Sequence, residues 1–312
     1  MFYIEKNDKP NWIEKMLNLV KLQDDTIILP IGKDKEDKED KEDKEDKEDK
    51  EDKKDIKENQ WKNHKENKKE IQMEKLAIKT NKIIQKYSNS KKIVLSKDMY
   101  KETKYINYLN TYGLEIQDGK WLFEILLPEI TEYIVNKKKI EKANISILIN
   151  DLTDIEFENI KILAKKYKTI NIVTNHIEKF KRLEKQLQEN EGIIITITNN
   201  KKQSLMKSQI ILNIDFPKEL INKYNMQDEA IIVNVKENIK INKKRFNGLT
   251  INDYEINFRE DKKESKNFNN KYYLKDLYES ELYKKQSISE IRKKIKVDKV
   301  IIAKLILNNG EL

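Results

Sequence analysis

Five polar residues in the central part of the chain have types and positions that could bind a ligand. They are Asp151, Thr153, Asn175, His176 and Asp215. Each follows a short run of β-branched residues, and open α/β sheets bind ligands beyond the carboxyl ends of their strands. Asp151 could hold a cation or an amine, and His176 could meet a phosphate or carry a proton. We therefore treat the five residues as a candidate cofactor-binding site.

Local structure offers a second explanation for most of these residues. Thr153 or Asp154 can cap the helix expected to follow them. Asn175 and Glu178 have the spacing of a capping box. Asp215 could point into the same cleft or could cap a helix that a proline opens shortly after it. Both explanations remain open at this point.

No catalytic or metal-binding constellation accompanies these residues in the sequence. The chain has no cysteine and two histidines, which excludes thiolate zinc sites, cysteine nucleophiles and a His-rich metal site. A P-loop and a Ser/His/Asp set are also missing. His176 lies in the first turn of an expected helix, where a single histidine is usually just exposed. The basic turn Lys243–Gly248 could bind an anion or be a solvated turn, and we expect Trp121 to pack in the core.

The elements that must position the site alternate from residue 145 to residue 235. Apolar runs predict strands at residues 145–149, 170–174, 193–198, 210–214 and 230–235. Amphipathic segments predict helices at residues 155–167, 177–189, 201–207 and 217–224. The strand segments are continuous apolar runs, which are typical of parallel strands covered on both faces. The pattern predicts an α/β fold with a Rossmann-like, doubly wound, mostly parallel sheet.

Composition divides the rest of the chain. We expect a small N-terminal segment (1–32), a disordered low-complexity linker (33–70), a small α/β region (71–140), the Rossmann-like domain (141–258) and a C-terminal helical tail (259–312). The linker begins with six Asp-Lys-Glu triplets that contain no apolar residue, so it should be disordered or marginally helical. In the small α/β region we expect helices at residues 76–87, 105–112 and 121–135 and a strand at residues 92–95.

Two segments of the expected domain resemble the nucleotide-binding half of the shikimate and quinate dehydrogenases. Residues 172–179 read Ile-Val-Thr-Asn-His-Ile-Glu-Lys, and residues 208–215 read Ser-Gln-Ile-Ile-Leu-Asn-Ile-Asp. Asn175 and the Glu178-Lys179 pair fit the first of that group's motifs, and His176 stands where an Arg would grip the 2′-phosphate of NADP. The resemblance implies an NAD(P)-dependent oxidoreductase whose substrate half lies within residues 72–140.

The first strand–helix turn of the expected domain opposes this implication. A dinucleotide site uses a glycine-rich turn that lets the backbone and a helix N-terminus approach the pyrophosphate. Residues 150–156 contain no glycine and include Asp151, Asp154 and Glu156. Each like charge at about 4 Å costs about 1 kcal/mol in water and several times more in a cleft. The cofactor is therefore unknown, with NAD(P) possible but disfavoured.

The charge of the chain gives little support to a nucleic-acid partner. The net charge is +9, and the segment 33–55 contributes −5, so the remainder carries +14. Only four of the 64 basic residues are Arg, which is the usual reader of bases and phosphates. The excess of Lys, Asn and Ile fits A/T-rich codons and solvated helix faces.

We expect a cytoplasmic protein, because no apolar run approaches the roughly 20 residues of a membrane span and the first residues lack a secretory signal. The leading hypothesis is a degenerate Rossmann-like module, without catalytic activity, that binds a small ligand or a protein partner. One alternative is an NAD(P)-dependent oxidoreductase similar to the shikimate and quinate dehydrogenases. A further alternative is a basic nucleic-acid-binding protein.

Overall fold

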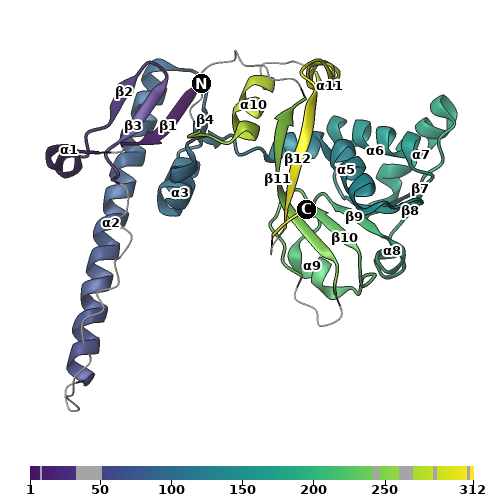
Figure 1. Ribbon diagram of the computed structural model, residues 1–312, viewed down its shortest axis with the longest axis horizontal. Helices are drawn as coiled ribbons and strands as arrows, with labels where there is room; N and C mark the ends of the chain where they lie inside the picture. Colours follow the sequence, from purple (N-terminus) through teal and green to yellow (C-terminus); the bar gives the residue numbers. More distant parts are fainter. Residues whose placement is uncertain (8, 33–50, 242–245, 260–269, 284–286, 308–309) are drawn as a thin grey trace. The chain divides into compact units, whose positions relative to one another are not determined.

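The computed structural model describes residues 1–7, 9–32, 51–241, 246–259, 270–283, 287–307 and 310–312, with the backbone alone for residues 51–65 and 310. The chain forms two compact units (Figure 1). Unit 1 comprises Met1–Asp118 and Asn267–Leu277, and unit 2 comprises Gly119–Lys266 and Tyr278–Leu312. Residues 119–140, which the sequence analysis grouped with the small α/β region, thus belong to the same unit as the expected Rossmann-like domain.

Unit 1 contains a five-stranded sheet in the order β2-β3-β1-β4-β5. Its strands are β1 (Phe2–Lys6), β2 (Lys21–Gln23), β3 (Thr26–Leu29), β4 (Lys92–Leu95) and β5 (Glu115–Ile116). Its helices are α1 (Trp12–Leu17), α2 (Glu51–Tyr87), the short 3-10 helix η1 (Lys97–Lys101) and α3 (Thr103–Thr111). Apolar side chains from the sheet, α2 and α3 form one core, which includes Ile4, Leu76 and Leu109.

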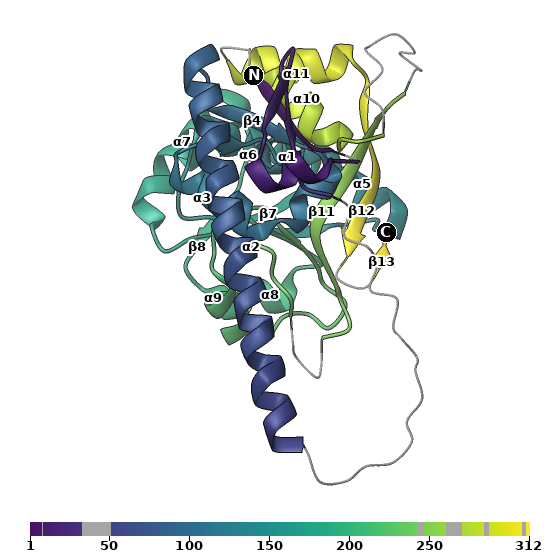
Figure 2. The same cartoon turned by 90° about the vertical axis from the view of Figure 1, so that its left-hand side faces the viewer.

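Helix α2 contains the predicted helix at residues 76–87 but begins much earlier, at Glu51 (Figure 2). Residues 51–70, which we expected to belong to a disordered or marginally helical linker, lie within this helix. Lys, Glu and Gln have good helix propensity, and no Gly or Pro interrupts residues 51–87. The triplets at residues 34–50 lie outside the described residues.

Unit 2 contains an eight-stranded sheet in the order β13-β12-β11-β10-β9-β6-β7-β8. Its strands are β6 (Asn144–Leu148), β7 (Thr169–Val173), β8 (Thr196–Thr198), β9 (Ile210–Asn213), β10 (Ile231–Asn234), β11 (Leu249–Phe258), β12 (Val300–Leu307) and β13 (Gly310–Glu311). Six neighbouring strands of this sheet, β11, β10, β9, β6, β7 and β8, are all parallel to one another. Numbered from β6 along the chain, they have the order 3-2-1-4-5-6 of the Rossmann fold. The predicted Rossmann-like α/β fold is confirmed.

Helices cover both faces of this sheet (Figure 1). They are α4 (Lys120–Ile125), α5 (Leu127–Lys138), α6 (Asp154–Lys166), α7 (Ile177–Glu191), α8 (Lys201–Lys207), α9 (Lys218–Lys223) and α11 (Ile288–Val297), and α10 (Leu274–Leu282) crosses the boundary between the units. One face of the sheet, with Ile147 and Leu212, packs against helices that include α6 and α7. The other face, with Leu148 and Ile211, packs against α8 and α9.

Three elements of unit 2 differ from those predicted from the sequence. The helix predicted at residues 121–135 is two helices, because Pro128 lies in the first turn of α5 and has no N–H to continue the hydrogen bonding of α4. The strand predicted at residues 193–198 is reduced to β8. The helical tail at residues 259–312 holds α10 and α11 but ends in β12 and β13, since the apolar run of β12 pairs antiparallel with β11. No helix in the described part of the chain is long and apolar enough to span a bilayer.

Candidate functional site

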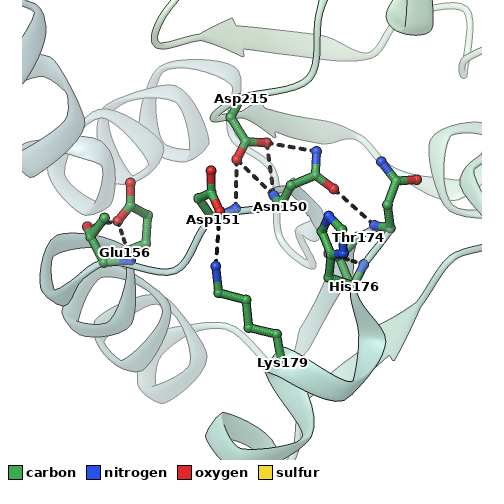
Figure 3. Close-up of polar contacts among 9 residues, drawn as sticks. Asn150, Asp151, Glu156, Thr174, His176, Lys179 and Asp215 are labelled. Carbon is green, nitrogen blue, oxygen red and sulfur yellow. Dashed lines mark hydrogen bonds and ion pairs between the residues drawn. The ribbon is translucent and has the colours of Figure 1, made fainter.

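The candidate site lies at the carboxyl edge of the unit 2 sheet, where the strand order reverses between β6 and β9. Open α/β sheets bind their ligands at this switch point. The loop after β6 and the loop after β9 meet there through Asp215 (Figure 3). Its carboxylate accepts the backbone N–H of Asn150 at 2.9 Å to each oxygen, the backbone N–H of Asp151 at 2.8 Å and the side-chain amide of Asn150 at 3.3 Å.

This arrangement bears directly on phosphate binding. In a Rossmann-type site the backbone N–H groups of the first strand–helix turn face the pyrophosphate. Here the carboxylate of Asp215 takes two of those donors, and it adds a negative charge where the phosphate would lie. The residues of this turn therefore do not fit a pyrophosphate. The expectation that Asp215 caps the following helix was wrong: α9 has Pro217 at its N-cap, and Asp215 faces the β6 loop.

The N-terminus of α6 is closed by its own side chains. Thr153 is the N-cap and forms a capping box with Glu156, whose Oε2 accepts the backbone N–H of Thr153 at 3.0 Å and the Thr153 hydroxyl. The predicted cap is thus Thr153. Because Glu156 is 1% exposed, its negative charge is held inside the protein at this helix end. The capping box accounts for Thr153 without a ligand.

A second carboxyl group shares this buried environment. Burial and a hydrogen bond to Glu156 raise the pKa of Glu124, on α4, to about 8. Burial opposes ionisation of Glu156 as well, but hydrogen bonds from Glu124 and Thr153 outweigh it and lower the Glu156 pKa. Glu156 Oε1 is buried and has no hydrogen-bond partner among the described residues, so protonation of the neighbouring Glu124 avoids placing two buried negative charges side by side. The pair therefore shares one proton at neutral pH.

A shallow pocket of about 620 Å³ opens at the carboxyl ends of β6 and β7, next to the turn that Asp215 holds. It is lined by Asp151, Asn175, His176, Ile177, Glu178 and Lys179. Lys179 Nζ lies 3.0 Å from Asp151 Oδ1 (Figure 3), and this hydrogen bond lowers the pKa of Asp151. The backbone N–H of Asn175 donates to Asn150 Oδ1 at 3.0 Å, which connects the pocket to the turn held by Asp215.

The structure thus separates the five predicted site residues into two groups. Asp151, Asn175 and His176 line the pocket, whereas Thr153 and Asp215 complete the local structure of the adjoining turn. The predicted capping box of Asn175 and Glu178 does not form: His176 is the N-cap of α7 and makes no side-chain cap bond.

His176, which lines the pocket, is exposed, as expected. The other candidates from the sequence are Trp121 and the basic turn Lys243–Gly248. Trp121 packs against the unit 2 core, as expected, and stacks on Tyr283 with ring centroids 4.2 Å apart. In the basic turn Lys243–Gly248, the three basic residues lie outside the described residues.

The residues that hold the β9 loop in place were not among those predicted from the sequence. Asn213, Asn234 and Asn252 lie on the adjacent strands β9, β10 and β11 and form a ladder of amides. Asn213 Nδ2 donates to Asn234 Oδ1 at 3.0 Å, and Asn234 Nδ2 donates to Asn252 Oδ1 at 2.9 Å. Asn213 also bonds both backbone polar groups of Phe216, which fixes the loop that carries Asp215. An Asn after each of three apolar runs was the signal in the sequence.

Replacing Asn234 with alanine should lower the free energy of unfolding by about 2 kcal/mol. Asn234 is 1% exposed, and its loss leaves the buried amide of Asn213 and the half-buried amide of Asn252 without their shared partner. Chemical denaturation measures the effect. Asn190→Ala, at an exposed position on α7, is the matched control and should change stability by less than about 0.5 kcal/mol. Equal effects of the two variants would show that the ladder contributes nothing.

Comparisons with known proteins add little to this geometry. No protein-family model matches the chain, and no curated protein does. Among solved structures, a match is found to a mitochondrial ornithine carbamoyltransferase from Coccidioides immitis, with 9% sequence identity and a TM-score of 0.27. The match covers 55% of this chain and 62% of that chain. No functional conclusion follows from a likeness of this size.

Proposed function

We propose that unit 2 is a degenerate Rossmann-like binding module that acts without NAD(P) and without catalysis. Its ligand is a small polar molecule, or a polar segment of a protein partner, that enters the pocket beside Asp151, Asn175 and His176. The observation that supports this proposal best is the carboxylate of Asp215 on the backbone N–H groups of Asn150 and Asp151. Unit 2 has the Rossmann strand order, but the Asp215 carboxylate occupies the backbone N–H groups that a phosphate would bind.

The charged side chains that line the pocket favour a zwitterionic ligand, which carries one positive and one negative group. Lys179 offers a cation and Asp151 and Glu178 offer anions within the same lining. Asp151 and Lys179 already pair with each other, so a zwitterionic ligand could exchange this exposed ion pair for two of its own at little net cost. Asn175 adds an amide that can donate and accept hydrogen bonds.

The main rival is an NAD(P)-dependent oxidoreductase similar to the shikimate and quinate dehydrogenases. The 3-2-1-4-5-6 strand order is compatible with it, and Asp215 opposes it. The basic nucleic-acid-binding alternative predicts binding that weakens steeply with salt. Neither alternative has a site residue in the described structure that favours it over the proposed module.

Thermal shift measurements on the full chain separate the module from the oxidoreductase. NAD, NADP and their reduced forms should leave the Tm unchanged at millimolar concentration. A cofactor at 100 times its Kd would add about 2.7 kcal/mol of stability, which is easily detected. A clear rise in Tm with any of the four would overturn the proposal in favour of the oxidoreductase.

The same assay tests the pocket. Small zwitterions and amines are screened as probes, and a compound that binds in the pocket should lose its effect in Lys179→Ala. Lys185→Ala is the matched control, because Lys185 is an exposed lysine two turns further along α7 and does not line the pocket. If active compounds shift both variants like the wild-type protein, the pocket is not the binding site.

A further inference from the structure

Unit 1 exposes a group of large apolar side chains on two adjacent elements. Trp12 and Met16 on α1 are 69% and 61% exposed, and Ile71 on α2 is 52% exposed. Single exposed apolar side chains are common on protein surfaces, whereas adjoining ones mark interaction sites. Trp and Met are also common anchors at protein interfaces.

These side chains line a groove between α1 and α2 with a volume of about 580 Å³. The two helices are held together at this point, because Lys79 Nζ donates to the backbone carbonyls of Leu17 at 2.9 Å and Asn18 at 2.8 Å. The capping box of Asn11 and Glu14 fixes the other end of α1. Hydrogen bonds between side chains and the backbone therefore hold both ends of the α1 wall of the groove in place.

The charged side chains that line the groove are all lysines. Lys15, Lys68 and Lys75 line it and are exposed, and among the described residues that line it none is acidic. An apolar floor between lysines suits a partner that carries apolar side chains flanked by carboxylates. The acidic triplets of this chain supply carboxylates but contain no apolar residue, so they lack the anchor that the groove requires.

We propose that this groove docks an acidic amphipathic helix of a protein partner. Trp12, Met16 and Ile71 would bury the apolar stripe of that helix, and the three lysines would pair with its acidic flanks. The concave shape favours a helix over a membrane surface, which is flat on this scale. The proposal concerns unit 1 and stands independently of the pocket in unit 2.

The test uses the full chain and a dye-labelled peptide of about 18 residues, enough for five helical turns. The peptide carries Leu at positions i, i+3, i+4 and i+7 and Glu on its other faces. Fluorescence anisotropy should show saturable binding that weakens as salt is added. A scrambled peptide without the stripe, and a peptide with Lys in place of Glu, should each bind at least about tenfold more weakly.

Variants then locate the binding site. Trp12→Ala with Met16→Ala, and separately Lys68→Glu with Lys75→Glu, should each raise the Kd by about tenfold or more. These positions are exposed, so the Tm should stay close to that of the wild-type protein. Ile194→Ala is the matched control, since Ile194 is 79% exposed in unit 2, and it should leave the Kd unchanged.

Three results would overturn the proposal. The first is no binding of the acidic peptide by the wild-type chain, and the second is binding that the groove variants do not change. The third is binding to phosphatidylcholine–phosphatidylserine vesicles that is lost in the Trp12 variant while the peptide is not bound, which would assign the surface to a lipid membrane.

Discussion

Replacing Arg292 with alanine is expected to lower the free energy of unfolding of unit 2 by about 3 kcal/mol. Arg292 lies on α11 with 9% of its surface exposed. Its Nη1 lies 2.9 Å and 3.0 Å from the two carboxylate oxygens of Glu129, and its Nη2 donates to Ile125 O and Asn159 Oδ1. The variant removes the one cation that joins α11 to α4, α5 and α6 through these groups, and it leaves buried acceptors without donors.

Chemical denaturation followed by tryptophan fluorescence measures this loss. Glu129→Gln should cost less, about 1 kcal/mol, because a third of the Glu129 side chain is exposed and water can replace the lost pair. Arg182→Ala, at an exposed position on α7, should change stability by less than about 0.5 kcal/mol. If Arg292→Ala behaved like Arg182→Ala, the cluster around Arg292 would not hold the helices together.

The proton shared by Glu124 and Glu156 should make unit 2 less stable as the pH rises from about 5 to about 8. The pKa of Glu124 is raised from 4.5 to about 8 by burial first and by the hydrogen bond to Glu156 second. Between these two values the folded state binds a proton that the unfolded state has lost, so unfolding becomes easier with increasing pH. A difference of one between the folded-state and unfolded-state pKa changes the free energy of unfolding by at most about 1.4 kcal/mol.

The charges around Glu124 act in both directions on this shift. Glu156 and Asp215 raise the pKa, and Lys236 lowers it. Glu156, whose pKa is lowered, adds stability that is lost only as the pH falls below its ordinary value of 4.5, so its effect lies in a different pH range.

Glu124→Gln tests this prediction, because the amide keeps a hydrogen-bond donor for Glu156 and cannot ionise. The Tm of the variant should exceed that of the wild-type protein by an amount that grows from pH 5 to pH 8. Glu184→Gln, at a non-buried position on α7, should show no such trend. A constant difference between Glu124→Gln and wild-type protein across this range would mean that the pair does not share a proton.

The order of strands and helices in unit 2 could be predicted because its local signals agree. β-branched runs at Ile145 and Ile210 alternate with amphipathic helices, and Gly192 ends α7 in the left-handed conformation that favours glycine. The sequence did not predict the break between α4 and α5 or the return of β12 to the sheet. Those depend on Pro128 and on pairing with β11, a partner more than 40 residues away in the chain.

The candidate site was predicted in part. Its location followed from the rule that ligands bind at the carboxyl ends of strands, and Asp151, Asn175 and His176 do share a pocket. The role of Asp215 could not be read from sequence, because its partners on the β6 loop lie 64 and 65 residues earlier. The raised pKa of Glu124 could not be read from sequence either, because it depends on burial and on Glu156 from another helix.

The central claim is that Asp215 occupies the amides that a nucleotide phosphate would need. The most direct test follows the backbone amide resonances of Asn150 and Asp151 in the full chain by nuclear magnetic resonance while NADH or NADPH is added. We predict no saturable change in either resonance at millimolar cofactor. We also predict that both amide protons move upfield in Asp215→Ala, which loses the carboxylate. Saturable movement of these two resonances in the wild-type protein, at cofactor concentrations below a millimolar, would contradict the account.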